Sequence, residues 1–451
     1  MAMFWIQFFL VLGAILLGIR RGGVALGMIG GLGVAVLVFL FRAAPSEPPI
    51  AVMLIILAVV TASATLQVAG GLDYLVQLAE KLLRAHPRYV TLLAPLCTFV
   101  LTMCVGTGHA VYALLPVIAD VAIRTKTRPE RPMAISSVAS QMAITASPVA
   151  AAVTTFLGYS AKMGAPVTIY DILKITIPAG IVGVVAAAAW SLNRGKDLYQ
   201  DPEFLKRLED QKFRDSLDVS VTTLDKKLPS TAKLSVALFF AGVLFIILLA
   251  LRDTAANAGY QLPRVLPLVD GKPVPMTTAV QIVMLAFGAF ILFATNVKAA
   301  DVAKSSVFTA GMIAVVSIFG IAWMSDTFVS ANKSFLISKV GSMVQYAPWT
   351  FAIAMFCVSA FVKSQAATLT VMIPFGIALK LPATLMLGLM PASYAYFFFA
   401  FYPSDLAAIN MDRTGTTRIG KYLLNHSFMI PGLIGVSVST VVAYTLSRIA
   451  F

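Results

Sequence analysis

The sequence predicts an all-α, polytopic membrane protein that contains two inverted repeats. Hydrophobic residues make up 59% of the chain and charged residues 12%, whereas soluble domains carry roughly 25% charged residues. The apolar runs are about 16 to 26 residues long, which suits membrane-spanning helices rather than the short alternating strands of a barrel. An apolar stretch interrupted by small polar residues occurs twice, which indicates the repeat.

The two copies of the interrupted stretch correspond in spacing. Gly106 and Pro116 lie 10 residues apart in the first half, as do Ser364 and Pro374 in the second. The next proline at a break follows 32 residues later in the first half and 29 residues later in the second. Interrupted apolar segments at matching places in two halves are typical of secondary transporters whose binding site lies between the repeats.

The apolar segments define the expected elements in chain order. Ten of them are expected to form helices, at residues 4–19, 23–41, 50–69, 132–158, 168–190, 233–251, 276–295, 305–327, 382–401 and 423–447. Two further stretches with small polar centres, 88–123 and 348–379, are expected to form re-entrant hairpins. Each repeat then has about five transmembrane helices and one hairpin.

The same pattern divides the chain into three parts. These are an N-terminal repeat at 1–192, a polar cytoplasmic linker at 193–232 and a C-terminal repeat at 233–451. A broken helix is expected after each hairpin, at about 132–158 and 382–411.

Basic residues set the expected orientation. Lys81, Arg84 and Arg88 precede the first hairpin stretch, and a basic run at 124–131 follows it. Because cytoplasmic loops are enriched in Lys and Arg, both ends of this stretch are expected in the cytoplasm. The second hairpin is then expected to enter from the periplasm. The first apolar run lacks a basic start and a small-residue cleavage signature, so we interpret it as an uncleaved helix. Both termini are expected to be periplasmic.

Two features point to helix packing. Amphipathic segments at 72–84 and 333–346 precede the hairpins, and their spacing is that of helices lying in the membrane interface. Each is either an arm that links a moving domain to a fixed one or a surface helix that covers the hairpin. Five glycines between Gly23 and Gly33 indicate close packing of the second helix, in a scaffold or at a dimer surface.

Other function classes find little support. The net charge of +14 suits cytoplasmic loops that contact anionic lipid headgroups, and no aromatic-basic motif indicates nucleic acid. Cys97, Cys104 and Cys357 lie inside apolar runs and have no metal-ligand spacing, so neither a metal nor a cofactor is expected. An intramembrane hydrolase would need a nucleophile with a positioned base, and neither Gly-x-Ser-x-Gly nor His-Glu-x-x-His occurs. The protein is therefore not expected to be an enzyme.

Motifs along the chain carry a resemblance to one family. They include Gly106-Thr107-Gly108-His109 and Tyr402-Pro403-Ser404-Asp405, and the others lie at 68–74, 115–116, 128–132, 140–141, 146–148, 194–198, 224–229, 320–324, 364–367, 406–409 and 415–420. In combination they resemble the anaerobic C4-dicarboxylate transporters of the Dcu family (the DcuA/DcuB group, nearer the DcuB branch), over essentially the whole chain. Three positions depart from the pattern of this family, namely Ala360, Lys363 and Phe401.

The resemblance implies a carrier of the bacterial inner membrane for fumarate, succinate, malate and aspartate. It implies exchange of one dicarboxylate for another or co-transport with cations, through an elevator motion of a transport domain along a scaffold domain. A homodimer and a sensor-kinase partner are implied by family analogy. A passive anion channel is the alternative, although two hairpins entering from opposite sides favour alternating access.

A dicarboxylate in the membrane needs compensation for both charges. Exposed N–H groups at the start of a half-helix provide it, and Gly, Ser and Thr let the ligand approach the backbone. One carboxylate is expected at the first hairpin tip and the other at the second. The candidate substrate-binding residues are Gly106, Thr107, Gly108, His109, Gln141, Thr145, Ser147, Ser364, Gln365, Thr368, Ser404 and Asp405.

Three of the polar residues keep two interpretations each. His109 is either hydrogen-bonded to a neighbour or a site donor whose protonation follows the substrate charge. Asp405 is either a ligand of the coupling ion or a cap of the half-helix that follows it. Lys363 either attracts dianions or extends towards the periplasm.

Overall fold

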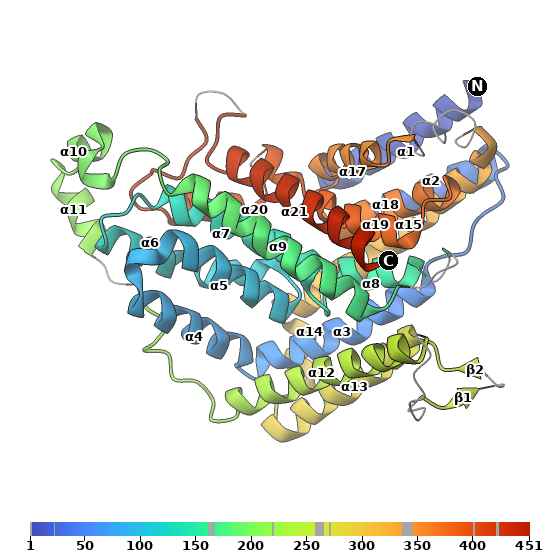
Figure 1. The fold of residues 1–451 in the computed structure, drawn as a ribbon, viewed down its shortest axis with the longest axis horizontal. Coiled ribbons are helices and arrows are strands. Elements are labelled where there is room, and N and C mark those ends of the chain that lie inside the picture. Colours follow the sequence, from blue (N-terminus) through green and yellow to red (C-terminus); the bar gives the residue numbers. More distant parts are fainter. Residues whose placement is uncertain are drawn as a thin grey trace.

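The computed structural model is almost entirely helical (Figure 1). It describes residues 2–21, 23–160, 163, 167–218, 221–257, 266–269, 272–335, 346–399, 402–420 and 424–451. The strands within these ranges, β1 (Leu268–Val269) and β2 (Lys272–Pro273), form a short antiparallel pair.

The helices follow one another in the order that the sequence predicts. In the first half they are α1 (Ala2–Arg21), α2 (Ala25–Ala35), α3 (Ile50–Val68), α4 (Gly71–Ala85), α5 (Val90–Val105), α6 (Leu115–Arg124), α7 (Glu130–Met142), α8 (Ala151–Ser160) and α9 (Ile169–Ser191). The linker holds α10 (Pro202–Arg207) and α11 (Gln211–Asp218). In the second half they are α12 (Ala232–Asn257), α13 (Met276–Thr295), α14 (Ala299–Lys304), α15 (Ser306–Ala331), α17 (Trp349–Val362), α18 (Gln365–Ala378), α19 (Ala383–Leu389), α20 (Pro403–Met411) and α21 (Met429–Ala450).

Among the described residues, eight helices are long and apolar enough to cross a membrane, or nine if the bent pair around α19 and α20 counts as one. This confirms a multi-span helical protein. The expected spans at 4–19 and 23–41 are helical but shorter than these eight. Conversely, the segment Pro87–Val105 is long enough to span by itself, although it was expected to be half of a hairpin.

The chain is interrupted at both expected hairpin tips. α5 ends at Gly106, whose φ of +82° lies in the left-handed region that glycine adopts without strain. α17 ends at Lys363, also left-handed, and α18 begins directly after Ser364. α5 contacts α6, and α17 contacts α18, so each tip joins two packed helices.

The two later helices are also broken, but the second differs from the prediction. α7 and α8 are separated by a 3₁₀ turn and an extended residue, Ser147, as expected. The predicted helix at 382–401 is wrong, because α19 ends at Leu389. Pro391 follows that end at once, and proline cannot donate a helical hydrogen bond. The second break therefore starts at Met390, and the segment Ala383–Phe399 is bent by 52° relative to Pro403–Met411.

The glycines of α2 pack within the chain. A Cβ on Gly27 would lie 2.0 Å from the carbonyl oxygen of Val316, and one on Gly30 would lie 2.5 Å from the carbonyl carbon of Gly320. The absence of side chains thus lets α2 and α15 approach at their backbones. This confirms the expected close packing and identifies α15 as the partner, whereas Gly31 has no neighbour within 4 Å.

The first amphipathic helix is confirmed as α4. Four of its polar residues are spaced by four, three and four positions, which puts them on one face. These four bind the linker segment 221–226, and they are Asp73, Gln77, Glu80 and Arg84. The second predicted segment, 333–346, lies mostly outside the described residues.

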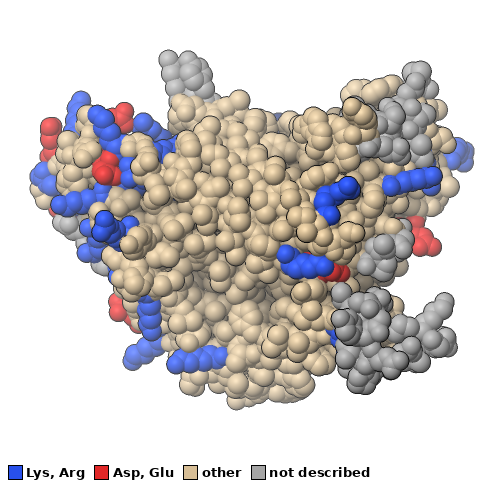
Figure 2. All heavy atoms as spheres, viewed as in Figure 1, with Lys and Arg blue, Asp and Glu red and all other residues tan. Residues whose placement is uncertain are grey.

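Charged side chains gather at one end of the molecule, around α10 and α11, while a broad middle band carries few of them (Figure 2). Such a band is what a lipid hydrocarbon layer of about 30 Å requires.

Candidate functional site

The interrupted segments meet at Gln141, which lies near the end of α7 and is fully buried. On one side, a Cβ on Gly108 would lie 2.3 Å from the Gln141 Nε2 atom, so only glycine fits there. On the other side, the Gln365 Nε2 group donates to the Gln141 carbonyl oxygen over 2.5 Å. Gln141 Nε2 also lies 3.5 Å from Ser404 Oγ. Residues from both predicted hairpin tips therefore contact one residue, Gln141, the first at its side-chain amide and the second at its main-chain carbonyl.

Tyr396 completes this cluster. Its hydroxyl donates to Gln141 Oε1 over 2.8 Å and accepts from Gln365 Nε2 at 3.4 Å. Tyr396 is fully enclosed and lies in the second break. No sequence pattern singled it out, because a tyrosine among apolar residues is usually a core residue.

Ser404 and Asp405 lie in the first turn of α20, against α7. Ser137 Oγ is 2.9 Å from Ser404 Oγ and donates to Asp405 Oδ1 over 2.6 Å. Sequence reasoning missed Ser137, although it lies four residues before Gln141 and so on the same face of α7. The cap position of α20 is Tyr402, without a side-chain cap bond, so Asp405 does not cap this helix.

Asp405 has an unusual environment. Only 1% of the residue is exposed, and its Oδ2 atom has no hydrogen-bond partner among the described residues. Within the described ranges, no Lys, Arg or His nitrogen lies within ion-pair distance of this carboxylate. The carboxyl group is therefore buried with a single hydrogen bond, from Ser137.

The first hairpin tip packs on the first break. A Cβ on Gly106 would lie 2.8 Å from the carbonyl oxygen of Val149. Thr107 Oγ accepts from the His109 backbone N–H at 3.4 Å and caps the 3₁₀ turn that follows. The His109 ring is exposed and stacks on Tyr112, with 5.6 Å between ring centroids.

The other predicted hydroxyl groups bond locally. Ser364 Oγ accepts from the Ala367 N–H at 3.3 Å and caps α18, and Thr368 Oγ donates to the Ser364 carbonyl over 2.8 Å. Thr145 Oγ donates to the Met142 carbonyl, and Ser147 Oγ accepts from the Val149 N–H. These four hydroxyls shape the breaks, whereas Gly108, Gln141, Gln365, Ser404 and Asp405 form the connected cluster.

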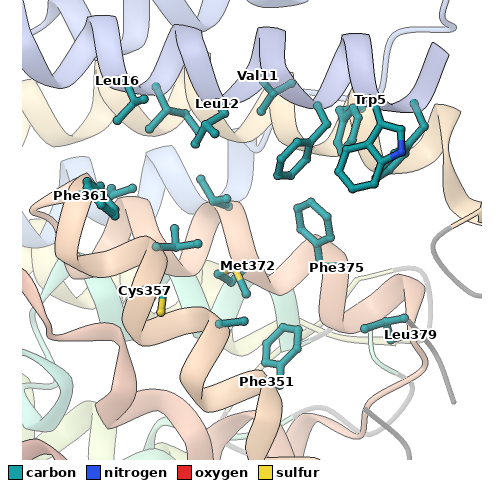
Figure 3. Close-up of a pocket in the computed structure, with 18 of the residues that line it drawn as sticks. Trp5, Val11, Leu12, Leu16, Phe351, Cys357, Phe361, Met372, Phe375 and Leu379 are labelled. Carbon is teal, nitrogen blue, oxygen red and sulfur yellow. The ribbon is translucent and has the colours of Figure 1, made fainter. Parts of the chain in front are cut away.

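A cavity of about 810 Å³ lies elsewhere, between α1 and the pair α17–α18 (Figure 3). Its walls are aromatic and aliphatic, with Trp5 and Leu12 on one side and Cys357 and Phe375 on the other. An apolar cavity cannot compensate a dianion, so it is not the substrate site. No group of three or more His, Cys, Asp or Glu side chains suited to a metal occurs in the described part of the chain.

Comparisons with known proteins identify the family. The model for "anaerobic C4-dicarboxylate membrane transporter" matches residues 3–451. The transporter DcuB of Escherichia coli O6:H1 is 45% identical, with 97% of each chain covered. The transporter DcuA of Wolinella succinogenes is 38% identical, covering 98% of this chain and 99% of the relative.

Two solved structures share the fold. They are the YdaH transporter of Alcanivorax borkumensis (TM-score 0.56, 13% identity, 87% of this chain and 85% of the other) and MtrF of Neisseria gonorrhoeae (TM-score 0.52, 11% identity, 87% and 80%). The sequence relatives confirm a bacterial multi-pass transporter that is not an enzyme. The chain belongs to the DcuA/DcuB family of anaerobic C4-dicarboxylate membrane transporters.

Proposed function

We propose that this carrier exchanges C4-dicarboxylates (fumarate, succinate, malate and aspartate) across the bacterial inner membrane, with one carboxylate held at each hairpin tip. One observation carries the proposal: Gly108 and Gln365, 257 positions apart in the sequence, both contact Gln141. A ligand with two carboxylates suits a site to which both tips contribute.

The second tip offers donors of the kind a carboxylate needs. The first four N–H groups of an α-helix have no partner within the helix. In α18, the Ser364 hydroxyl accepts from the Ala367 N–H and the Ser364 carbonyl accepts from the Thr368 N–H. The N–H groups of Gln365 and Ala366 have no partner among the described residues and are available to a ligand. The positive end of the helix dipole adds attraction for an anion.

The first tip supplies a matching set. Gly108 brings the backbone close to the Gln141 side-chain amide. Thr107 and His109 are the residues on either side of Gly108 in the chain. In this proposal Thr145 and Ser147 support the first tip, and Ser404 supports the second. Asp405 carries a charge of the same sign as the substrate, so it does not bind a carboxylate in its ionised form.

A counterflow experiment tests the function. Labelled fumarate should enter proteoliposomes that are preloaded with succinate much faster than it enters empty ones. Equal rates of fumarate entry with and without internal succinate would instead indicate a channel.

The proposal includes inverted repeats at 1–192 and 233–451, with 193–232 as a cytoplasmic linker and both termini in the periplasm. Matching contacts support it: α1 packs on α2 as α12 packs on α13, and α2 packs on α15 as α13 packs on α3. The directions also agree, because α1 and α12 run oppositely in Figure 1, as do α9 and α21. Two copies of one fold that are related by an axis in the membrane plane would show this packing and these opposite helix directions.

The proposal also includes an elevator motion. The transport domain consists of the two hairpins and the two broken helices, and the remaining helices form the scaffold. It is supported by the convergence of these four interrupted segments on one site and by the helix α4, which connects α3 to the first of them. A homodimer and a sensor-kinase partner stay predictions of the family resemblance.

A further inference from the structure

We propose that Asp405 is the proton-binding group through which dicarboxylate transport is coupled to protons, and that Ser137 positions its carboxyl group. The inference rests on the proposed function, because it assigns a second ligand to the same site. It starts from a carboxyl group that is buried, unpaired and adjacent to the cluster around Gln141.

The burial of Asp405 requires compensation that the described structure does not provide. An ionised carboxylate in an apolar interior is very costly without a partner. Oδ1 accepts one hydrogen bond from Ser137, and Oδ2 accepts none among the described residues. A proton on Oδ2 neutralises the group and needs no further ligand. A divalent cation would need about six oxygen ligands, and the described carboxylates do not cluster there.

Charged groups on the neighbouring elements are already paired with one another. α20 packs against α6, α7 and the 3₁₀ turn Gly108–Ala113. On α6, Asp120 binds Arg124 and also Arg84 and Arg413. At the start of α7, Glu130 binds Arg128 and Arg194, and Arg131 binds Asp197. The remaining titratable groups that face this region are His109, Tyr112, Tyr394, Tyr396 and Tyr402.

The position of Asp405 connects the proton to the substrate. Ser137 binds both Asp405 and Ser404, and Ser404 lies beside the Gln141 amide. A dianion bound at Gln141 repels an ionised Asp405 and therefore favours its protonation. By thermodynamic linkage, protonation of Asp405 strengthens dianion binding by the same factor. A proton taken from water onto Oδ2 on one side is returned to water when the site opens on the other side.

Ser137 holds the carboxyl group in one orientation. Its hydroxyl donates to Oδ1, which leaves Oδ2 as the protonated oxygen. Because this hydrogen bond favours the ionised form, its removal should shift proton binding to higher pH. Ser137 is thus a positioning residue, and threonine at this position keeps the hydroxyl.

The test uses the full-length protein in proteoliposomes with fumarate as substrate. A dye inside the vesicles reports proton movement during net uptake, and counterflow gives the apparent KM between about pH 6 and 9, where fumarate is fully ionised. In the wild type, the apparent KM should rise with pH by up to about tenfold per unit, the slope for one linked proton. Fumarate should also drive proton entry.

Asp405→Asn should remove both the pH dependence of the apparent KM and the substrate-driven proton signal. Ser137→Ala should move the pH profile to higher pH, and Ser137→Thr should restore it. Asp301→Asn, at an exposed position on α14, is the matched control and should keep the wild-type profile. A substrate-driven proton signal in Asp405→Asn, or an unmoved profile in Ser137→Ala, would overturn the assignment. Absence of counterflow in the wild type would instead count against the proposed function.

Discussion

Gly108 shows how a single position can limit the site. Any side chain there would collide with the Gln141 amide, since even a Cβ would approach it to 2.3 Å. We predict that Gly108→Leu abolishes exchange while the protein still folds, measured by fumarate–succinate counterflow and by thermal unfolding. Gly31→Leu is the control, because nothing lies within 4 Å of that position. Wild-type affinity in Gly108→Leu would refute the assignment of this tip.

A substitution at Ser364 tests whether the second hairpin tip contacts the substrate. Its hydroxyl caps α18, and loss of such a cap costs about 0.5–2 kcal/mol. We predict that Ser364→Ala abolishes exchange without unfolding the protein and that Ser364→Thr, which keeps a capping oxygen, retains it. Counterflow over a range of fumarate concentrations measures the maximal rate and the apparent affinity of both variants. Unaltered affinity in Ser364→Ala would show that this tip does not contact the substrate.

Tyr396 tests the link between the two halves. Removal of its hydroxyl leaves Gln141 Oε1 without its donor, and an unsatisfied buried group costs about 1–3 kcal/mol. We expect the unsatisfied Gln141 Oε1 atom to disturb the geometry of the site. Tyr396→Phe should then weaken the apparent affinity for fumarate roughly tenfold, since about 1.4 kcal/mol corresponds to a factor of ten. Tyr444→Phe on α21 is the control. Equal affinities in the two variants would mean that the bridge has no role in binding.

At the scale of elements, α4 and the linker form one unit. Glu80 on α4 is fully buried and accepts from Thr222 Oγ and from both the N–H and the hydroxyl of Thr223. Arg84 binds the same carboxylate over 2.7 Å. Burial alone would raise the pKa of Glu80, but the hydrogen bonds from Thr223, Thr222 and Arg84 outweigh it, so the pKa lies below its usual 4.5.

A depressed pKa fixes the direction of the pH effect. The stabilisation that ionised Glu80 gives to the folded protein is complete above the pKa that this group has in the unfolded chain. It is lost as the pH falls through the lower pKa of the folded state. We predict that Glu80→Gln releases the linker at neutral pH, because an amide cannot replace the carboxylate as an acceptor for all these donors. The protection of the Thr223 amide against hydrogen exchange, taken relative to the intrinsic rate at each pH, should fall at pH 7, whereas in the wild type it should fall only in acid. Equal exchange in both proteins at pH 7 would contradict this role.

At the scale of the whole molecule, the elevator proposal requires the hairpin α17–α18 to move past α1. Cys357 and Leu12 both line the apolar cavity between them, Cys357 from α17 and Leu12 from α1 (Figure 3). After replacement of Cys97 and Cys104 by alanine, a cross-link between Cys357 and Leu12→Cys should stop counterflow, and reduction should restore it. Full turnover with the cross-link in place would rule out motion of this hairpin against α1.

Sequence reasoning located the interruptions because their signals are local. Glycine at 106 and serine at 364 favour the end of one helix and the start of the next through their own backbone and side-chain preferences. The second break was predicted only at its end, around Pro403. Its start at Met390–Pro391 was overlooked, although Pro391 is a local signal for the end of a helix.

Hydropathy and helix-breaking residues act over short stretches of the backbone, so the amino-acid pattern alone establishes a helical membrane protein with interrupted segments. The packing of the folded chain is needed to show that Gln141, Gln365 and Tyr396 form one cluster and that Ser137 holds Asp405. Those contacts join residues up to 268 positions apart. They depend on how whole helices pack against one another, and no local pattern encodes which polar side chains meet when apolar surfaces are buried.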